Sequence, residues 1–400
     1  MQEVASTALV HEPVEVFGVL VAVFGAVFWA SGLPSLKRLF GIIPPVLWAY
    51  FAPTLLTTAG VIPAASPIYG WMTRHLLPVA LLLLMITVDL KAVLRLGPMA
   101  LAMMVTGTIG IIIGAPVVYL LFGGLLPPDA WKGLAALSGS WIGGTANLVA
   151  IKESVGAPDS IMGPIIVVDT VVGYGWLAVL LLLSSRQQAF DRWNRAHSAA
   201  LEDANRRVLA TVAERRPLDL RSLAIIIGLG FGGAILAIEL GDRLPALDWA
   251  GSTVISKTTW AVLIVVTGGL LLSFTPVQRL EQAGASTLGY AALYLLLTAI
   301  GAQADLKAVL AAPAFMLAGL VWIAIHATLL LLMARVLRAP LFFFATASMA
   351  NIGGPASAPL VAGVYHPAMA PVGLLMAVAG YVLGIYGGLF CAAILATLAR

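Results

Sequence analysis

The chain has 400 residues, of which 61% are hydrophobic and only 10% are charged. A soluble domain carries about 25% charged residues, so this composition excludes a soluble globular protein and predicts an all-α polytopic membrane protein in contact with the lipid bilayer. The net charge of +4 fits an excess of Lys and Arg in cytoplasmic loops, and we expect no nucleic-acid partner. The single cysteine, Cys391, excludes an internal disulfide framework.

The first half of the chain, residues 1–184, holds six apolar segments close to the roughly 20 residues that a membrane-spanning helix needs. The N-terminus has no basic region and no small-residue cleavage site, so we expect the first segment to stay as a helix rather than be removed as a signal peptide. Pro44 and Pro45 make the second segment the one that is hardest to treat as a full crossing. The six segments lie at 14–34, 41–63, 72–89, 98–125, 130–153 and 158–184.

A polar linker, residues 185–221, separates this half from the second half, residues 222–400. Its arginine excess predicts a cytoplasmic location. The mixture of acidic and basic side chains favours a solvated connector over a docking surface for a membrane or a partner. Six more apolar segments follow the linker, at 222–241, 250–275, 285–303, 313–337, 341–364 and 367–398.

Two short patterns occur once in each half and indicate an internal duplication. The hexamer that runs from Asp89 to Leu94 returns letter for letter at residues 305–310, and the pair Gly143-Gly144 is echoed by Gly353-Gly354. We therefore predict two structural repeats with about 11–12 transmembrane segments in total. An odd number of crossings in each half would make the repeats inverted and an even number would make them parallel, and the residues alone leave this open.

Each Gly-Gly pair interrupts an apolar segment, 130–153 in the first half and 341–364 in the second. A glycine costs roughly 1 kcal/mol against alanine in a helix interior, and Thr145 and Pro355 suit the first turn of a new helix. We therefore predict a broken crossover helix in each half. In lipid the freed backbone groups need protein or water around them. The alternative, that the glycines only allow close helix packing, is weakened by their matching positions.

A break of this kind offers free N–H groups to an anion and free carbonyl oxygens to a cation. Neutral side-chain oxygens near both breaks could add ligands for Na⁺. We therefore predict that the two breaks form a solute site and an ion site, with Na⁺ or H⁺ as the coupling ion and no cofactor or resident metal. The predicted solute site consists of Ser140, Gly143, Gly144, Thr145, Asn351, Gly353, Gly354 and Ser357. The predicted ion site consists of Asn147, Asp169, Asn351 and Ser348.

Asp169 lies in the middle of its apolar segment. A carboxylate at the centre of a membrane helix costs about 2.5–3.5 kcal/mol on insertion scales, so Asp169 is the best candidate for an ion ligand or a proton carrier, with a structural hydrogen-bond acceptor as the alternative. The matching segment of the second half has no acid, so the halves are not chemically equivalent. His326 could relay protons, although a hydrogen-bonded core histidine is the commoner arrangement.

Seven short segments spread over both halves form a recognisable set: Ser66–Tyr69, Leu76–Pro78, Asp89–Lys91, Arg95–Pro98, Gly139–Asn147, Ala350–Ala356 and Gly380–Gly384. In these segments the chain resembles the integral-membrane proteins grouped as domain of unknown function 819, the YjcL-like family. It departs from that family at Ile385, where an asparagine is common. The resemblance implies a panel domain, a core domain with two crossing broken helices, inverted repeats and an elevator-like movement, as in the related sodium–bile acid symporters, glutamate–sodium symporters and cation–proton antiporters.

Enzyme motifs such as His-Glu-x-x-His, a nucleophile elbow or a Walker loop do not occur in the chain, so we expect no enzyme. We predict a secondary active transporter of the bacterial inner membrane that couples Na⁺ or H⁺ to the movement of a small anionic organic solute. The alternatives are a cation–proton antiporter without an organic substrate, and a non-transporting receptor or scaffold that uses the linker. The sequence leaves open the substrate, the direction of transport and whether the protein is a homodimer.

Overall fold

The computed structural model describes residues 8–42, 45–196, 217–249, 252–304, 312–366 and 369–399. This part of the chain is helical apart from one antiparallel hairpin of two short strands, β1 (Leu247–Trp249) and β2 (Ser252–Ile255). By length and composition, eight of its helices can cross a membrane, or ten if each of two bent pairs counts as one span. The predicted helical membrane protein is confirmed, but the expected 11–12 segments are too many.

The helices begin and end close to the predicted apolar segments. Several start with proline, which fits because a first-turn N–H has no intrahelical partner to lose. The first half forms α1 (Pro13–Ser31), η1 (Pro34–Leu36), α2 (Lys37–Ile42), α3 (Pro45–Thr58), α4 (Pro67–Ile86), α5 (Leu90–Leu94), α6 (Pro98–Phe122), η2 (Gly123–Leu125), α7 (Ala130–Gly143), α8 (Thr145–Ser154) and α9 (Asp159–Leu183). The rest forms η3 (Ser184–Arg186), α10 (Gln187–Asn194), α12 (Leu220–Arg243), α13 (Lys257–Leu272), η4 (Pro276–Ala283), α14 (Ala285–Ala302), α15 (Ala312–Leu337), α16 (Leu341–Ile352), α17 (Gly354–Tyr365) and α18 (Ala370–Leu398).

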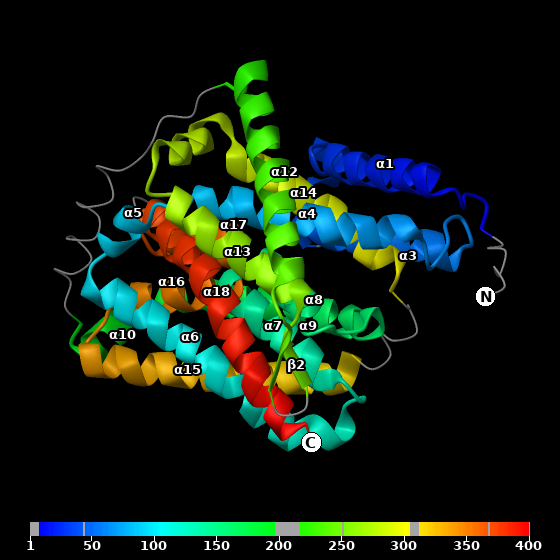
Figure 1. Ribbon diagram of the computed structural model, residues 1–400. Helices are drawn as coiled ribbons and strands as arrows, with labels where there is room; N and C mark the ends of the chain where they lie inside the picture. The colour runs from blue at the N-terminus through cyan, green and yellow to red at the C-terminus, as the bar shows by residue number, and fades with distance from the viewer. Residues whose placement is uncertain are drawn as a thin grey trace.

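The helices pack as two bundles. The scaffold bundle consists of α1, α3, α4, α12, α13 and α14, and the core bundle consists of α6 to α9 and α15 to α18. Each bundle contains helices from both halves of the chain, because α4 packs on α14 and α6 packs on α15 (Figure 1). The bundles meet where α8 lies against α4 and α13, and where α18 lies against α13.

Glycines let the core helices approach closely. Gly110 and Gly114 of α6 face His326 and Trp322 of α15, and a Cβ at either glycine would meet those residues. On α18, glycines recur every fourth residue at 380, 384 and 388 and lie against α7 and α8. This is the small-residue packing expected between membrane helices, so part of the glycine content does serve helix packing.

The segment 130–153 does not form a crossover helix, because α7 and α8 fold back on each other as a helical hairpin. Gly139 of α7 lies against Ile151 of α8, although these residues are twelve positions apart and would be about 18 Å apart along one continuous helix. Both open ends of the hairpin lie at the start of α9: Gly133 faces Ile161, and Lys152 pairs with Asp159 of α9 at 2.7 Å.

The segment 341–364 also forms a hairpin, made of α16 and α17, and it enters from the other end of α9. The backbone N–H of Leu341, the first residue of α16, donates to Asp191 of α10 at 2.8 Å. The hydroxyl of Tyr365, the last residue of α17, donates to the carbonyl of Leu180 in the last turn of α9 at 2.7 Å. The expectation of two crossing broken helices is therefore wrong in shape, because the breaks are hairpin tips.

The duplicated hexamer has a local role in its first copy. The Asp89 carboxylate accepts a hydrogen bond from the Ala92 N–H at 2.9 Å and so caps the five-residue helix α5. The second copy, residues 305–310, lies outside the described residues, as do residues 197–216 of the predicted linker. The described end of the linker forms α10, and Asn194 fixes α10 to the core bundle by donating to the carbonyls of Ala334 and Ala339.

Candidate functional site

The tips of the two hairpins meet. A Cβ atom built on Gly354 would lie 3.9 Å from the Cα of Gly144. Both glycines have positive φ, 90° at Gly144 and 59° at Gly354, a region that glycine enters without steric cost. The tips are also partly exposed at Gly144, Thr145 and Gly353, whereas the preceding turns of α7 and α16 are buried. Side chains therefore do not completely cover the backbone at the point where the hairpins touch.

Four helix ends converge at this point. The C-terminal ends of α7 and α16 carry partial negative charge, and the N-terminal ends of α8 and α17 carry partial positive charge. The Gly144 N–H donates to Ser140 O at 2.6 Å and the Gly353 N–H donates to Met349 O at 2.9 Å, so each first helix closes its last turn before the chain reverses. The arrangement offers poles of both signs within the protein, as a joint anion and cation site requires.

Asn147, in the first turn of α8, is fully buried. Its Nδ2 donates to the carbonyls of Tyr381 at 3.2 Å and Gly380 at 3.4 Å on α18. Its Oδ1 has no hydrogen-bond partner and no solvent contact among the described residues. A buried acceptor normally has a hydrogen-bond partner. Because Asn147 Oδ1 has none, it is available as a ligand for a cation.

Asp169, in the middle of α9, is connected to the first hairpin. It accepts a hydrogen bond from Ser140 Oγ at 3.0 Å, and the Ser140 carbonyl in turn receives the Gly144 N–H of the tip. The residue is partly exposed although it lies in a membrane-spanning helix. A carboxylate in that position needs protein or water around it, and Asp169 has one hydroxyl donor and an accessible face.

Asn351, in the last turn of α16, is committed to packing rather than open to a ligand. Its Oδ1 accepts from Thr108 Oγ1 at 2.9 Å, and its Nδ2 donates to the carbonyls of Ala347 and Met104. These bonds tie the second hairpin to α6. An ion or solute that binds Asn351 Oδ1 would have to displace the Thr108 hydroxyl. Asn147 and Asn351 were both predicted as ion ligands, but their environments differ.

Ser348 also has its partners within the protein. Trp176 Nε1 donates to Ser348 Oγ at 2.8 Å, and Ser348 Oγ lies 2.9 Å from His326 Nε2. His326 Nδ1 lies 2.9 Å from the carbonyl of Gly107, which can only accept, so Nδ1 carries the proton and Ser348 donates to Nε2. His326 is a hydrogen-bonded core histidine that joins α6, α15 and α16.

The two remaining polar residues of the predicted solute site lie just after the tips. Thr145 is partly exposed, and Ser357 of α17 is 5% exposed. The structure gives neither hydroxyl a hydrogen-bond partner within the described chain, so both are available to a ligand. No group of three His, Cys, Asp or Glu side chains in the described part of the chain could hold a metal ion.

Sequence reasoning missed the residues that hold the site residues in place. Thr108, Met104 and Trp176 contact Asn351 or Ser348. The Gly380 carbonyl accepts from the Asn147 amide, and Gly384 leaves room for that amide on α18. The glycines carried a signal, because their four-residue spacing puts them on one face of a helix. Thr108 and Trp176 carried none, since neither differs in sequence context from the other residues of an apolar segment.

The fold and the paired hairpin tips define a transporter-like polytopic membrane protein. The chain belongs to the family described as Protein of unknown function (DUF819), whose family model matches residues 18–398. A relative from Bacillus subtilis (strain 168), "Uncharacterized membrane protein YjcL", is 23% identical over 342 residues, which cover 81% of this chain and 83% of the relative. The resemblance to the YjcL-like family is thus confirmed.

Proposed function

We propose that this protein is a secondary active transporter that couples Na⁺ or H⁺ to the movement of a small anionic organic solute, and that it performs no enzymatic chemistry. The observation that carries the proposal is the contact between the tips of two helical hairpins that enter the core bundle from opposite ends of α9. Irregular backbone between membrane-spanning helices is tolerated only where it is buried in protein or lies beside water. Here it is partly exposed and has helix poles of both signs around it.

The solute and the ion would use different parts of the junction. The N-terminal ends of α8 and α17, with the free hydroxyls of Thr145 and Ser357, would hold an anionic group. Asn147 Oδ1 would ligate Na⁺ together with carbonyls of the neighbouring helix ends. Asp169 would carry the balancing negative charge or the proton. Asn351 and Ser348 would hold the second hairpin in place rather than touch the ion.

The proposed transport cycle is elevator-like movement of the core bundle against the scaffold bundle. The polar contacts between the bundles are single hydrogen bonds from hydroxyl groups, which can break and re-form as the bundles move. The Ser154 carbonyl of α8 accepts from Thr259 Oγ1 at 3.2 Å and Ser256 Oγ at 3.5 Å at the start of α13, and the hydroxyls of Thr267 and Tyr386 bond at 2.7 Å. The opposite entry of the hairpins supports inverted repeats with five crossings and one hairpin in each half.

The charge distribution supports a cytoplasmic linker in an inner-membrane protein. Val93 and Leu96, in and just after α5, belong to the same buried apolar cluster as Leu180 near the linker end of α9 and Leu341 at the start of α16, so Lys91 and Arg95 lie on that side. Because segment 130–153 is a hairpin and does not cross the membrane, Lys91 and Arg95 lie on the same side as the arginine-rich linker. By the positive-inside rule, this clustering of basic residues supports a cytoplasmic location for that side.

The test is sodium-dependent stability of the purified protein. Thermal unfolding is followed in detergent with NaCl or with choline chloride at equal ionic strength, from about pH 5 to pH 9. Sodium should stabilise the wild type and should lose this effect in Asn147→Ala and Asp169→Asn. Asp129→Asn is the matched control, because Asp129 is an exposed acid outside the site that pairs with Lys132. Stability that is indifferent to sodium across the whole pH range would contradict sodium coupling.

A second measurement separates the proposal from cation–proton antiport. Vesicles containing the protein and a pH-sensitive dye, with no organic solute, are given a Na⁺ or K⁺ gradient. The proposed symport predicts no proton flux under these conditions, since ion movement needs the solute. A proton flux that disappears in Asp169→Asn would establish the antiporter alternative, which the partly exposed Asp169 favours.

A further inference from the structure

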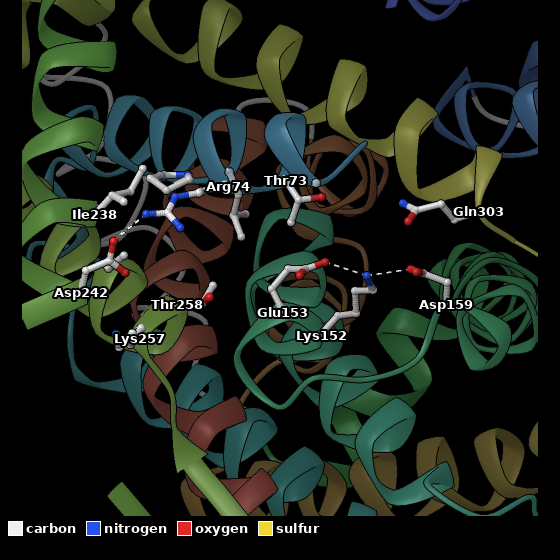
Figure 2. Close-up of a pocket in the computed structure, with 14 residues that line it drawn as sticks. Thr73, Arg74, Lys152, Glu153, Asp159, Ile238, Asp242, Lys257, Thr258 and Gln303 are labelled. Atoms are coloured by element: carbon white, nitrogen blue, oxygen red, sulfur yellow. Dashed lines mark hydrogen bonds and ion pairs between the residues drawn. The ribbon is translucent and has the colours of Figure 1, made fainter. Parts of the chain in front are cut away.

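A cavity of about 320 Å³ lies between the two bundles, away from the hairpin tips. Helices α4, α12 and α13 and the end of α14 line it from the scaffold bundle, and the end of α8 with the start of α9 lines it from the core bundle (Figure 2). Because α9 begins here and ends at the linker, the cavity lies at the membrane side opposite the linker. Its lining is rich in charged and polar residues.

The core wall of the cavity carries an excess negative charge. Lys152 Nζ lies 2.6 Å from Glu153 Oε1 and 2.7 Å from Asp159 Oδ1, and Figure 2 shows it between the two carboxylates. The Lys152 side chain is only 7% exposed, and those of Glu153 and Asp159 are 18% and 28% exposed. One ammonium therefore serves two largely shielded carboxylates, so an incoming cationic group would find a carboxylate that is only partly neutralised.

The scaffold wall carries an excess positive charge. Arg74 pairs with Asp242 at 2.5 Å, which leaves Lys257, at the start of α13, as a second cation on this wall. The structure gives the Lys257 ammonium no carboxylate partner among the described residues. Figure 2 shows Arg74, Asp242 and Lys257 on one side of the cavity and Lys152, Glu153 and Asp159 on the other.

We propose that this cavity binds a small zwitterionic solute, with its carboxylate on Arg74 and Lys257 and its ammonium group on Glu153 and Asp159. Walls of opposite net charge favour a ligand that carries both signs over a simple anion or a simple cation, since each of those would be repelled by one wall. The volume would hold about ten waters at about 30 Å³ each, which suits an α-amino acid of up to roughly ten non-hydrogen atoms. A pocket of this size is at the lower end of ordinary small-molecule sites.

This inference narrows the anionic solute of the proposed function to one that also bears an ammonium group, and in that respect it rests on the proposed function. The cavity would be an initial binding site between the bundles, which the solute occupies before it moves to the hairpin tips. Binding to the cavity is nevertheless a separate property from transport. A protein that transports without binding at the cavity, or binds without transporting, would separate the two.

The test is equilibrium binding of the standard α-amino acids to the purified full-length protein by isothermal titration calorimetry in detergent. For the tightest ligand, two analogues are compared: the carboxylic acid that lacks the amino group and the amine that lacks the carboxylate. The amino acid should bind with both analogues at least about tenfold weaker. Glu153→Gln and Lys257→Gln, each of which removes the excess charge of one wall, should both weaken amino-acid binding by about tenfold or more.

Glu15→Gln, on the exposed face of α1, and Lys91→Gln, on α5, are matched controls that should bind as the wild type does. Lys257 is exposed, so its variant tests the site without disturbing the fold. The inference is overturned if no amino acid binds with Kd below about 10 mM, if the carboxylic acid binds as tightly as the amino acid, or if both wall variants bind like the wild type.

Discussion

Gly144 and Gly354, from opposite halves of the chain, touch at the tips of two hairpins that enter the core bundle from opposite ends of α9. Neither position tolerates a side chain easily, because both have positive φ. The contact brings together the two features of the sequence with the strongest claim to function. It also depends on both interruptions, since a continuous helix through either position would form no tip there.

Gly144→Ala should destabilise the protein and abolish the sodium effect on its stability. With φ 90° and ψ −177°, Gly144 lies in a region that costs a residue with a Cβ about 1–3 kcal/mol. The measurement is thermal unfolding in detergent with and without sodium. Gly25→Ala is the control, because Gly25 is exposed on α1 with nothing within 4 Å of an added Cβ, and it should stabilise by about 0.5–1 kcal/mol. Equal stability of the two variants would contradict the described tip geometry.

The apolar segments and their ends could be predicted from the sequence, because hydropathy and proline act locally. The hairpins could not. A Gly-Gly pair shows that a helix is interrupted, but it does not encode the angle between the two pieces. The useful signal lay further on: Lys152 and Glu153 follow the break by only two turns, so α8 is too short and too charged at its end to complete a crossing.

The residue types of the candidate site could be predicted from local sequence, but the partners of each side chain could not. Side-chain type identified both Asn147 and Asn351 as candidate ligands. In the structure Asn147 has a buried oxygen without a partner, whereas the oxygen and the nitrogen of the Asn351 amide are both bonded to α6. That difference depends on helices far away in the sequence, α18 in one case and α6 in the other. Pairing between such helices follows from packing, which a pattern within one segment does not contain.

Lys152→Met should be strongly destabilising. Its ammonium pairs with Glu153 and Asp159 while 7% exposed, so the variant leaves two shielded carboxylates without their cation, at a cost of about 3–5 kcal/mol. Lys132→Met is the matched control, because Lys132 forms a more exposed pair with Asp129 at 3.0 Å and should cost at most about 1 kcal/mol. Chemical denaturation in detergent measures both. A small loss for Lys152→Met would mean that water already reaches the pair.

Gly384→Ala should act on Asn147 without changing it. A Cβ at residue 384 would overlap Asn147 Nδ2 and push the amide out of its groove on α18, at about 1–3 kcal/mol. We expect the sodium-dependent stabilisation to be lost as in Asn147→Ala. Gly175→Ala, on α9 with nothing within 4 Å of its added Cβ, should retain it. A Gly384→Ala protein that keeps the full sodium response would show that the orientation of Asn147 does not matter to the ion.

Thr108→Val should destabilise the second hairpin. The change leaves Asn351 Oδ1 buried without its donor, which costs about 1–3 kcal/mol. Thr106→Val on the same helix is the control, since the Thr106 hydroxyl bonds only to the Ala102 carbonyl one turn earlier. Hydrogen exchange followed by mass spectrometry should show faster exchange in peptides from 341–365 for Thr108→Val alone. Unchanged exchange in that region would mean that Asn351 does not hold α16 to α6.

Cross-linking the bundles should stop transport if the core bundle moves as a unit. The hydroxyls of Tyr290 on α14 and Tyr381 on α18 are in direct contact, and Tyr381 also lies next to Gly144. Photo-oxidation of tyrosines to dityrosine would therefore join the two bundles beside the hairpin tips. Tyr294 stacks on Tyr290, so a Tyr294→Phe background removes the competing product. In that background, sodium-driven solute flux should fall in proportion to the cross-linked fraction measured by mass spectrometry. Tyr290→Phe, which cannot form the cross-link, should keep its solute flux after photo-oxidation. Flux that persists in fully cross-linked protein would exclude movement of the core bundle past α14, and a fixed-scaffold gating mechanism would have to replace it.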